Sequence, residues 1–288
     1  MLLIARNRAI RFPRRPLVMG IVNLGADSFS GDAITDPRRA VARAKEMIAE
    51  GADIIDVGAE SARTNRPAIS EGEEMDRLAP FIEEFPSVAD AAPADPAQVF
   101  PPWLSINTWR PSVASGALAL GGEILNDIGG LPTDENARLC AQTGAALLIM
   151  HSVGEPKIPH THVGYDDIME TLDRFFTEKL AAALRAGLPA EAVILDPGLD
   201  FAKQREANLT ILRKLALLQK FDRPLLLPVS RKTVIGDVLG IPKPEERDAG
   251  TIACLVSGLA RGAAIFRVHN VRAAAQAIRL IAAIEGNS

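Results

Sequence analysis

The chain has 288 residues, of which 48% are hydrophobic and 24% are charged, and its formal net charge at pH 7 is -4. This composition supplies enough apolar side chains for a substantial core. It carries no basic excess, which argues against nucleic acid as the main partner, because phosphate backbones are bound through Lys and Arg. No segment approaches the ~20 consecutive apolar residues that cross a bilayer, and the apolar run at the start of the chain is too short for a signal peptide. We therefore expect a cytoplasmic protein without a membrane partner.

Short apolar runs that end in polar residues recur along the chain and predict buried parallel strands. Eight runs fit this pattern, at residues 17–22, 53–57, 103–106, 123–126, 145–150, 192–195, 224–228 and 264–268. Patterns with a helical period separate them, at residues 37–50, 71–84, 111–120, 134–143, 165–186, 207–218, 245–261 and 271–285. This alternation predicts an α/β fold, a single-domain (β/α)8 TIM barrel. An open doubly wound sheet fits less well, because its Gly-rich fingerprint does not follow the first strand.

Two segments fall outside this alternation. Residues 1–16 are predicted to form a short N-terminal cap or hairpin, and the barrel is predicted to extend over residues 17–288. Residues 86–102 are rich in Ala, Pro and Asp, and they are predicted to be a flexible insertion between the second helix and the third strand. Helix-to-strand loops lie at the end of a barrel that is opposite the active site. Neither segment is therefore expected to take part in the chemistry.

Polar side chains stand at the end of almost every predicted strand, where a barrel of this class places its active site. Asn107, Asn126 and Asp196 combine hydrogen-bond donors and acceptors, which suits the edge of a flat heterocycle. Positive charge comes from four further positions: Arg63, Lys232, Arg267 and His269. Such residues suit a phosphate or pyrophosphate group. The pattern predicts a site for a polar ring that carries an anionic tail.

The polar motifs resemble those of the dihydropteroate synthase family, whose members are pterin-binding TIM barrels. The matching motifs are Met19-Gly-Ile-Val-Asn23, Asp27-Ser-Phe-Ser30, residues 51–61 with Arg63, Ser105-Ile-Asn-Thr108, Asn126-Asp-Ile128, Met150-His151, Leu195-Asp-Pro-Gly198, Ser230-Arg-Lys232 and Arg267-Val-His269. The resemblance implies a transferase of folate biosynthesis that uses Mg²⁺. Its reaction would join 6-hydroxymethyl-7,8-dihydropterin pyrophosphate to p-aminobenzoate. The resemblance also implies a homodimer that forms through the late helices.

The resemblance further implies a role for each matched position. The pterin would be bound by Asn107, Asn126, Met150, Asp196, Phe201 and Lys232. The pyrophosphate would be bound by Arg63, Arg267 and His269, and the p-aminobenzoate by Phe29, Phe201 and Ser230. Asn23 would contact Mg²⁺. The catalytic residues would be Asn107, Asp27 and Lys232, with Asp27 and Phe29 on a loop that closes over the reacting centre.

Several positions differ from the pattern of the family. Asn107 stands where the family has Asp, which removes a negative charge from the ring site. Residues 24–26 and 62–67 depart from the family's first two loops, and position 62 loses a hydroxyl. Asp200 places a new carboxylate next to the ring site, and Asn270 stands where Asp is usual.

These differences leave three functions open. The first is a divergent synthase. The second is a paralogue that acts on a reduced folate, by one-carbon or methyl transfer or by hydrolysis. The third is a non-catalytic pterin-binding protein. The retained cationic residues Arg267 and His269 favour a ligand of the pyrophosphate type, and with it the synthase.

Overall fold

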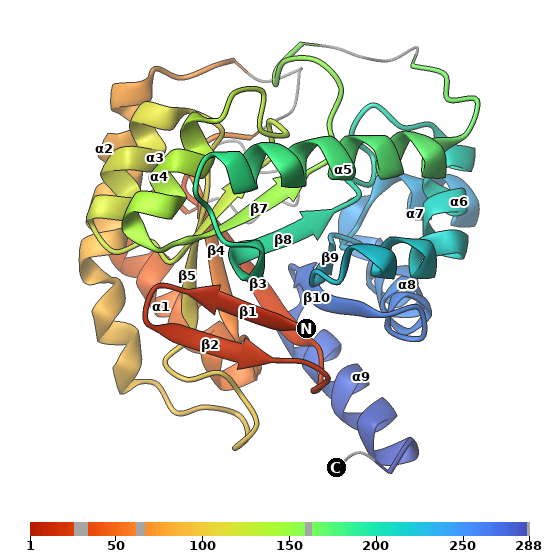
Figure 1. Cartoon of the computed structure of the whole chain (residues 1–288). Helices are drawn as coiled ribbons and strands as arrows, with labels where there is room; N and C mark the ends of the chain where they lie inside the picture. Colours follow the sequence, from red (N-terminus) through yellow and green to blue (C-terminus); the bar gives the residue numbers. More distant parts are fainter. Residues whose placement is uncertain (26–33, 62–66, 159–162, 287–288) are drawn as a thin grey trace.

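The computed structural model describes residues 1–25, 34–61, 67–158 and 163–286. In these residues the chain forms a closed barrel of eight parallel strands that is surrounded by helices (Figure 1). The strands are β3 (Leu17–Asn23), β4 (Ile54–Gly58), β5 (Trp103–Asn107), β6 (Ile124–Asp127), β7 (Ala146–Met150), β8 (Val193–Asp196), β9 (Leu225–Leu227) and β10 (Ala263–Val268). They follow one another in chain order, and β10 pairs with β3 to close the barrel. The predicted TIM barrel is confirmed.

The described helices form a layer around these strands (Figure 1). They are α1 (Pro37–Glu50), α2 (Glu71–Glu84), α3 (Pro111–Ala119), α4 (Glu135–Thr143), α5 (Ile168–Arg185), α6 (Arg205–Lys214), α7 (Thr233–Leu239), α8 (Asp248–Leu259) and α9 (Val271–Ile284). Each predicted helix is found, although those predicted at 207–218 and 245–261 are partly 3-10 helix. The pattern predicts no helix at 233–239, because seven residues are too few for a clear helical period. Helix α7 is therefore an addition.

Helix α1 shows how the sequence determines such an element. Asp36 accepts a hydrogen bond from the Arg38 amide at 2.9 Å, and Pro37 occupies the first helical position. Gly51 ends the helix with a φ of 114°, in the left-handed region that favours glycine. Its buried residues recur at helical spacing: Ala40, Val41, Ala44, Met47 and Ile48. This face packs on the outside of the barrel.

Each strand alternates between the helical layer and the barrel interior. On β4, Ile55 and Val57 belong to the outer apolar cluster, whereas Ile54 belongs to the inner cluster. Two residues further along several strands, on the same face as an inner apolar residue, the side chain becomes polar. The positions are Asp56 after Ile54, Ser105 after Trp103, Asn126 after Ile124, Asp196 after Ile194 and Arg267 after Ile265. The interior is thus apolar at one end and polar at the C-terminal ends of the strands.

The apolar end is covered by an antiparallel hairpin of β1 (Leu2–Ala5) and β2 (Arg8–Arg11) (Figure 1). Leu3 and Ile10 join the inner cluster, and Arg6 Nε donates to the Gly122 carbonyl at 2.9 Å. In the segment 86–102, the side-chain Nε2 of Gln98 donates to the carbonyls of Ile48 and Ala52, at 2.9 and 2.7 Å. The flexibility of that segment and the division at residue 16 remain predictions.

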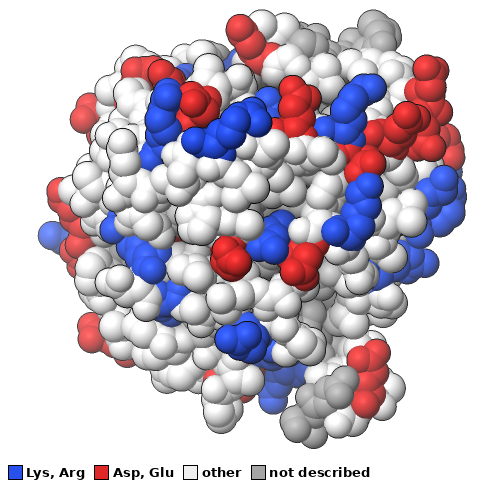
Figure 2. Space-filling model, in the orientation of Figure 1, with Lys and Arg blue, Asp and Glu red and all other residues white. Residues whose placement is uncertain are grey.

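The face seen in Figure 2 mixes Lys and Arg with Asp and Glu, without a broad area of one sign. This mixture agrees with the small net charge of -4. Among the helices of the described residues, none is long and apolar enough to cross a membrane.

Candidate functional site

The polar end of the barrel is organised around Asp56, which lies on β4 and is fully buried. Its carboxylate accepts hydrogen bonds from Ser105 Oγ at 2.6 Å and from Arg267 Nε at 2.7 Å. Asn126 Nδ2 donates to both carboxylate oxygens, at 3.1 and 3.2 Å. Charge-assisted bonds of this kind are strong and directional. Asp56 therefore joins β4 to β5, β6 and β10 across the barrel interior. We refer to the polar end of the interior, with Asp56 as its floor and Asn107, Asn126 and Asp196 around it, as the candidate pocket.

Two asparagines present acceptor atoms above this floor. Because Asn126 turns its Nδ2 toward Asp56, its Oδ1 is left buried and has no hydrogen-bond partner among the described residues. Asn107 Oδ1 is in the same situation. Gly58 gives Asn107 room, since a Cβ at position 58 would lie 3.2 Å from the Asn107 Cβ. Unpaired buried acceptors are unfavourable, so both oxygens are suited to N–H groups of a ligand.

Asp196 adds a third acceptor at the end of β8, beside Met150 on β7. Its side chain is buried, and the Gly198 amide donates to its Oδ1 at 2.7 Å. Burial raises the pKa of Asp196 to about 6, although this hydrogen bond and the charges of Lys232, Lys203 and Arg267 oppose the rise. A buried carboxyl with a perturbed pKa among other polar groups is a candidate functional residue.

The segment after β8 carries Phe201, and Lys232 comes to it from the segment after β9. Lys232 Nζ donates to the Leu199 carbonyl at 2.8 Å and lies 4.8 Å from the centre of the Phe201 ring. These two residues are thus in contact at the rim of the pocket, although they are far apart in the sequence. Both are predicted pterin-binding residues, and the fold brings them together.

Lys203 is a buried residue that has no predicted role. Its Nζ donates to the carbonyls of Gly198 and Phe201, at 2.9 and 3.0 Å. Burial lowers the pKa of Lys203 to about 7, with the Asp196 carboxylate opposing and Lys232 reinforcing the change. Gly198 has a φ of 66°, and a Cβ there would lie 2.0 Å from the His151 carbonyl oxygen. Both residues hold the turn that follows Asp196.

Ser230 and His269 are in contact, from the segments that follow β9 and β10. Ser230 Oγ lies 2.8 Å from His269 Nδ1, and the His269 amide donates to the same oxygen at 3.1 Å. Arg267 lies two residues before His269 on β10, with its Nε bound to Asp56. The predicted pyrophosphate and aminobenzoate residues of β9 and β10 are therefore neighbours.

Met150 and His151 are adjacent in the sequence but differ in their surroundings. Met150 is buried at the end of β7 and belongs to the inner cluster, as expected of a residue that lines the pocket. The His151 ring packs edge-on against Phe175, with ring centres 4.8 Å apart. Burial lowers the pKa of His151 to about 3, and the charge of Lys203 adds to this effect. His151 is thus a neutral packing residue.

The Asp200 carboxylate, a departure from the family pattern, forms its hydrogen bonds outside the pocket. It accepts hydrogen bonds from the amides of Thr233 and Val234 in the first turn of α7, the latter at 3.4 Å. Asn208 Nδ2 donates to it at 3.1 Å. Asp200 therefore caps α7, which explains this departure from the family pattern without a catalytic role.

Asp127 likewise points away from the pocket. Although it follows Asn126 directly, its carboxylate accepts from Asn136 Nδ2 at 2.9 Å and from the Gly129 amide at 2.8 Å. Burial raises the pKa of Asp127 to about 6, against the hydrogen bonds that it accepts. The alternation of a strand accounts for the difference between neighbours: Asn126 faces the interior and Asp127 faces the helices.

Asn23 stands at the end of β3, paired in register with Gly58. Amide oxygens are ligands of the hard kind that Mg²⁺ accepts. The described part of the chain contains no cluster of three or more His, Cys, Asp or Glu side chains that could hold a metal. A single amide oxygen fits a cation that arrives with a pyrophosphate, because Mg²⁺ usually keeps phosphate oxygens and waters as its other ligands.

Three predicted site residues cannot be placed. Asp27 and Phe29 belong to residues 26–33, and Arg63 belongs to residues 62–66. Both segments lie outside the described residues, and their assigned roles stay predictions. Ser61, the last described residue before the second segment, follows the C-terminal end of β4 by three residues.

The sequence places Asp56 among the polar strand-end residues that should face the pocket, but it assigns Asp56 no binding or catalytic role. One local signal was available: an acidic residue inside the otherwise apolar run from Ile54 to Val57. Its partners could not be found from that signal, because Arg267 is 211 positions away in the sequence.

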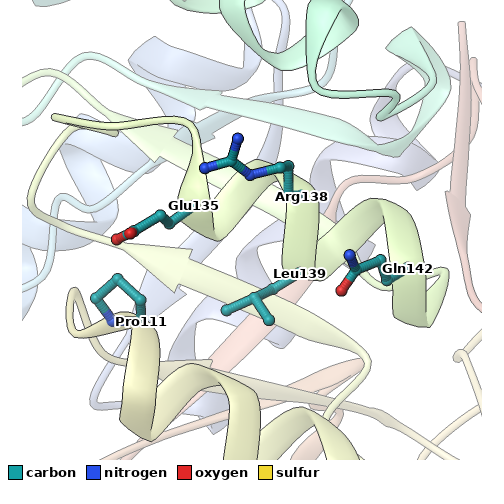
Figure 3. A pocket seen from close by; sticks show the side chains of 5 residues that line it. All are labelled: Pro111, Glu135, Arg138, Leu139 and Gln142. Carbon is teal, nitrogen blue, oxygen red and sulfur yellow. The ribbon is translucent and has the colours of Figure 1, made fainter.

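A separate surface groove lies between α3 and α4 (Figure 3). Its cavity volume is about 260 Å³, and it is lined by Pro111, Glu135, Arg138, Leu139 and Gln142. These residues belong to the helical layer, and none of them carries a predicted role. The polar pocket inside the barrel is the better candidate.

The fold and this pocket define a barrel enzyme that binds a pterin-like ring. The profile of the family described as "Pterin binding enzyme" matches residues 19–269. The chain is 38% identical to dihydropteroate synthase of Escherichia coli over 269 residues, which are 93% of this chain and 91% of that protein. It is 36% identical to dihydropteroate synthase of Bacillus subtilis over 278 residues, 96% and 91% of the two chains. The chain therefore belongs to the pterin-binding enzyme family, among the dihydropteroate synthases.

Solved structures agree with this assignment. The Yersinia pestis dihydropteroate synthase in complex with a sulfonamide drug has a TM-score of 0.89 and is 34% identical, and the match covers 99% of this chain and 100% of that chain. Dihydropteroate synthase of Thermus thermophilus in complex with 6HMPPP has a TM-score of 0.82 and is 35% identical, with the same coverage of 99% and 100%.

Proposed function

We propose that this chain condenses 6-hydroxymethyl-7,8-dihydropterin pyrophosphate with p-aminobenzoate, giving dihydropteroate and pyrophosphate for folate biosynthesis. The observation that carries the proposal is the set of buried acceptors over the Asp56 floor. Asn107 Oδ1, Asn126 Oδ1 and the Asp196 carboxylate form an edge that matches the amino and N–H groups of a pterin. The relatives with dihydropteroate synthase names extend over more than nine-tenths of the chain, which disfavours the folate-modifying and non-catalytic alternatives.

Pterin recognition follows from the direction of these hydrogen bonds. Asn126 and Asp196 accept from the ring, and Lys232 would meet its carbonyl from the opposite side. Met150 and Phe201 supply apolar surface around the ring. A buried site whose polar atoms are left unpaired by a wrong ligand discriminates strongly against that ligand.

The pyrophosphate would lie toward β10. His269 and the terminal nitrogens of Arg267 face it in this proposal, with Arg63 joining from the segment after β4. Because Asp56 takes the Arg267 Nε, the fork geometry of the guanidinium is oriented by the protein before the ligand arrives. Asn23 would hold Mg²⁺ together with the pyrophosphate. When bound, this ion would neutralise charge on the departing oxygen.

The reaction is a substitution at the pterin methylene carbon. The C–O bond to pyrophosphate weakens first, and its electron pair leaves with the pyrophosphate oxygen. The amine of p-aminobenzoate then forms the new C–N bond and loses a proton. Asn107 and Lys232 would contact the ring while positive charge develops on it, and Asp27 would approach on the first loop. Ser230, Phe201 and Phe29 would position the aminobenzoate.

The test is direct. Purified protein is mixed with the pterin pyrophosphate, p-aminobenzoate and Mg²⁺, and pyrophosphate release and dihydropteroate are measured. We expect both products in equal amounts. Tight binding of a reduced folate without pyrophosphate release would overturn the proposal. A variant Asp196→Asn serves as the matched control, because it keeps the side-chain shape and removes the carboxylate.

Two further expectations belong to the same proposal. We propose a homodimer that forms through the late helices, where Leu280 and Ile284 of α9 are exposed. We also propose a cytoplasmic location, since the reaction uses water-soluble substrates. Sedimentation would test the first expectation, and microscopy of a labelled chain would test the second.

A further inference from the structure

The start of α8 holds the backbone of the segment Ser230-Arg-Lys232, which links two of the proposed substrate residues. Arg231 has a φ of 58°, a left-handed conformation that is strained in a residue with a Cβ. Its amide donates to Thr251 Oγ1 at 3.0 Å, and its carbonyl accepts from Arg247 Nη1 at 3.1 Å. The strained turn therefore depends on side chains at the start of α8.

The position of Arg247 is itself built into the fold. Its guanidinium also donates to the Lys232 carbonyl at 3.3 Å and to the Ile241 carbonyl at 2.9 Å. Gly236 leaves the space for it, because a Cβ at position 236 would lie 2.6 Å from the guanidinium carbon. Such a buried arginine fixes the backbone that surrounds it.

Asp248, the first residue of α8, supplies a further contact. Arg231 Nε donates to Asp248 Oδ1 at 2.8 Å, and Arg231 Nη2 donates to Oδ2 at 3.2 Å. Asn270 Nδ2 donates to the same Oδ2 at 2.9 Å. Asn270 follows His269, so the Asp248 carboxylate connects the segment that carries Ser230 and Lys232 with the segment that carries His269.

We infer that Asp248 is a positioning residue for the substrate-binding segments of β9 and β10, and that Asn270 is its matched partner. Both ends of the Asn270 side-chain amide are hydrogen-bonded: Nδ2 donates to Asp248, and Oδ1 accepts from the Ala273 backbone amide at 3.1 Å to cap α9. An aspartate at position 270 could still cap α9, but it would face the Asp248 carboxylate at hydrogen-bond distance. The amide at position 270 therefore donates to the carboxylate at position 248, where a second carboxylate would repel it.

The titration of Asp248 agrees with this geometry. Burial alone would raise the pKa of Asp248, but the hydrogen bonds from Arg231 and Asn270 and the charges of Arg231 and His269 outweigh it. The pKa is lowered as a result, and the carboxylate stays ionised at neutral pH.

The inference rests on the proposed function, and its test separates the two. Three variants are compared with the native chain: Asp248→Asn, Asn270→Asp, and the double variant that exchanges the two residues. Affinity for pteroate is measured directly, since this probe spans the ring site and Ser230. The KM values for both substrates, kcat and the unfolding temperature are measured beside it.

We expect each single variant to weaken pteroate binding and raise the KM for p-aminobenzoate about tenfold, because misplacement of a binding group is costly. The double variant restores both values to within about threefold, since one carboxylate and one amide again face each other across positions 248 and 270. As a control, Glu50→Gln removes a carboxylate that pairs with Arg43 and Arg272 on the outer helices, and it leaves both values unchanged.

Two results would overturn the inference: unchanged affinity in Asp248→Asn despite a lower unfolding temperature, or no recovery in the double variant. Neither depends on turnover, because pteroate binding is read without it. A native chain that binds pteroate but releases no pyrophosphate would refute the proposed function and leave this result standing.

Discussion

Two aspartates in the β4 segment have different roles. Asp53 and Asp56 are both fully buried, and each binds an arginine from a distant segment. Asp53 accepts from two nitrogens of Arg15, at 2.9 and 3.0 Å, and from the amides of Val18 and Val99, both at 2.8 Å. Its partners have no further function in the pocket, and its contacts close the apolar end of the barrel.

Asp56 differs from Asp53 in the roles of its hydrogen-bond partners. Asn126 is oriented by Asp56 and keeps a buried acceptor without a partner among the described residues, and Arg267 keeps the terminal nitrogens of its guanidinium. Asp53 thus binds groups that have no role in the pocket, whereas Asp56 orients the side chains of residues that are proposed to bind the ligand. Burial and an arginine partner alone do not separate the two cases.

The largest effect on turnover is expected for Asp56→Asn. The change leaves Arg267 without its carboxylate and lets the Asn126 amide rotate, so both lose their orientation. We expect kcat/KM to fall roughly a hundredfold. Ser105→Ala is the control, because it removes only one of the donors to Asp56, and its loss should stay below about tenfold. Equal losses in the two variants would contradict the role given to Asp56.

A pH effect of about tenfold per unit is expected for pteroate binding. In the proposed site the ligand binds the ionised Asp196, whose pKa in the free protein is raised to about 6. Below pH 6 a proton must leave Asp196 before binding, so affinity falls about tenfold for each unit, and above pH 6 this dependence on Asp196 ends. Titrations between about pH 5 and pH 8 would show the change of slope. Asp196→Asn should bind weakly and lose the slope below pH 6, and a native curve that is flat below pH 6 would contradict the assignment.

A smaller change, an increase, is expected for Asn107→Asp. A carboxylate at this position would lie beside the ring as positive charge develops on it, and kcat should rise several-fold. The KM for the pterin pyrophosphate should change little. A fall in kcat would show instead that the nearby Asp56 already supplies the negative charge that this site can hold.

The smallest effect on turnover is expected for Asp53→Asn, despite a large effect on stability. Removing one member of a buried ion pair should reduce the free energy of unfolding by about 3 kcal/mol. Well below the unfolding temperature, kcat/KM should stay within about twofold of the native value. Urea unfolding and steady-state kinetics on the same sample give both numbers. A loss of activity as great as that of Asp56→Asn would remove the distinction between the two aspartates.

Most of the fold follows from local patterns in the sequence. All eight barrel strands begin and end within about two residues of the predicted ranges. The signal is local, because an apolar run with a polar end extends over only a few neighbouring residues. Helix α7 could not be predicted in this way because it is short. In addition, the side chain that caps it, Asp200, lies 33 positions earlier in the sequence.

The candidate site could be predicted from the sequence less completely than the fold. The sequence places Asn107, Asn126 and Asp196 at strand ends, where the structure finds them, and Lys232 follows β9 by five residues. It cannot show that Asn126 presents its oxygen to the pocket, or that Asn270 is matched to Asp248. Both facts depend on side chains that meet only in the folded chain. The residues of the first two loops, Asp27, Phe29 and Arg63 among them, lie outside the described residues and keep their predicted roles.

The bond between Asp56 and Arg267 has a consequence for the order of synthesis. The aspartate leaves the ribosome 211 residues before its arginine, which corresponds to roughly 10 to 40 s of translation. During that interval the carboxylate has no arginine and must remain hydrated. The floor of the pocket therefore forms only after the last barrel strand has been made, and an incomplete nascent chain should be unable to bind a pterin.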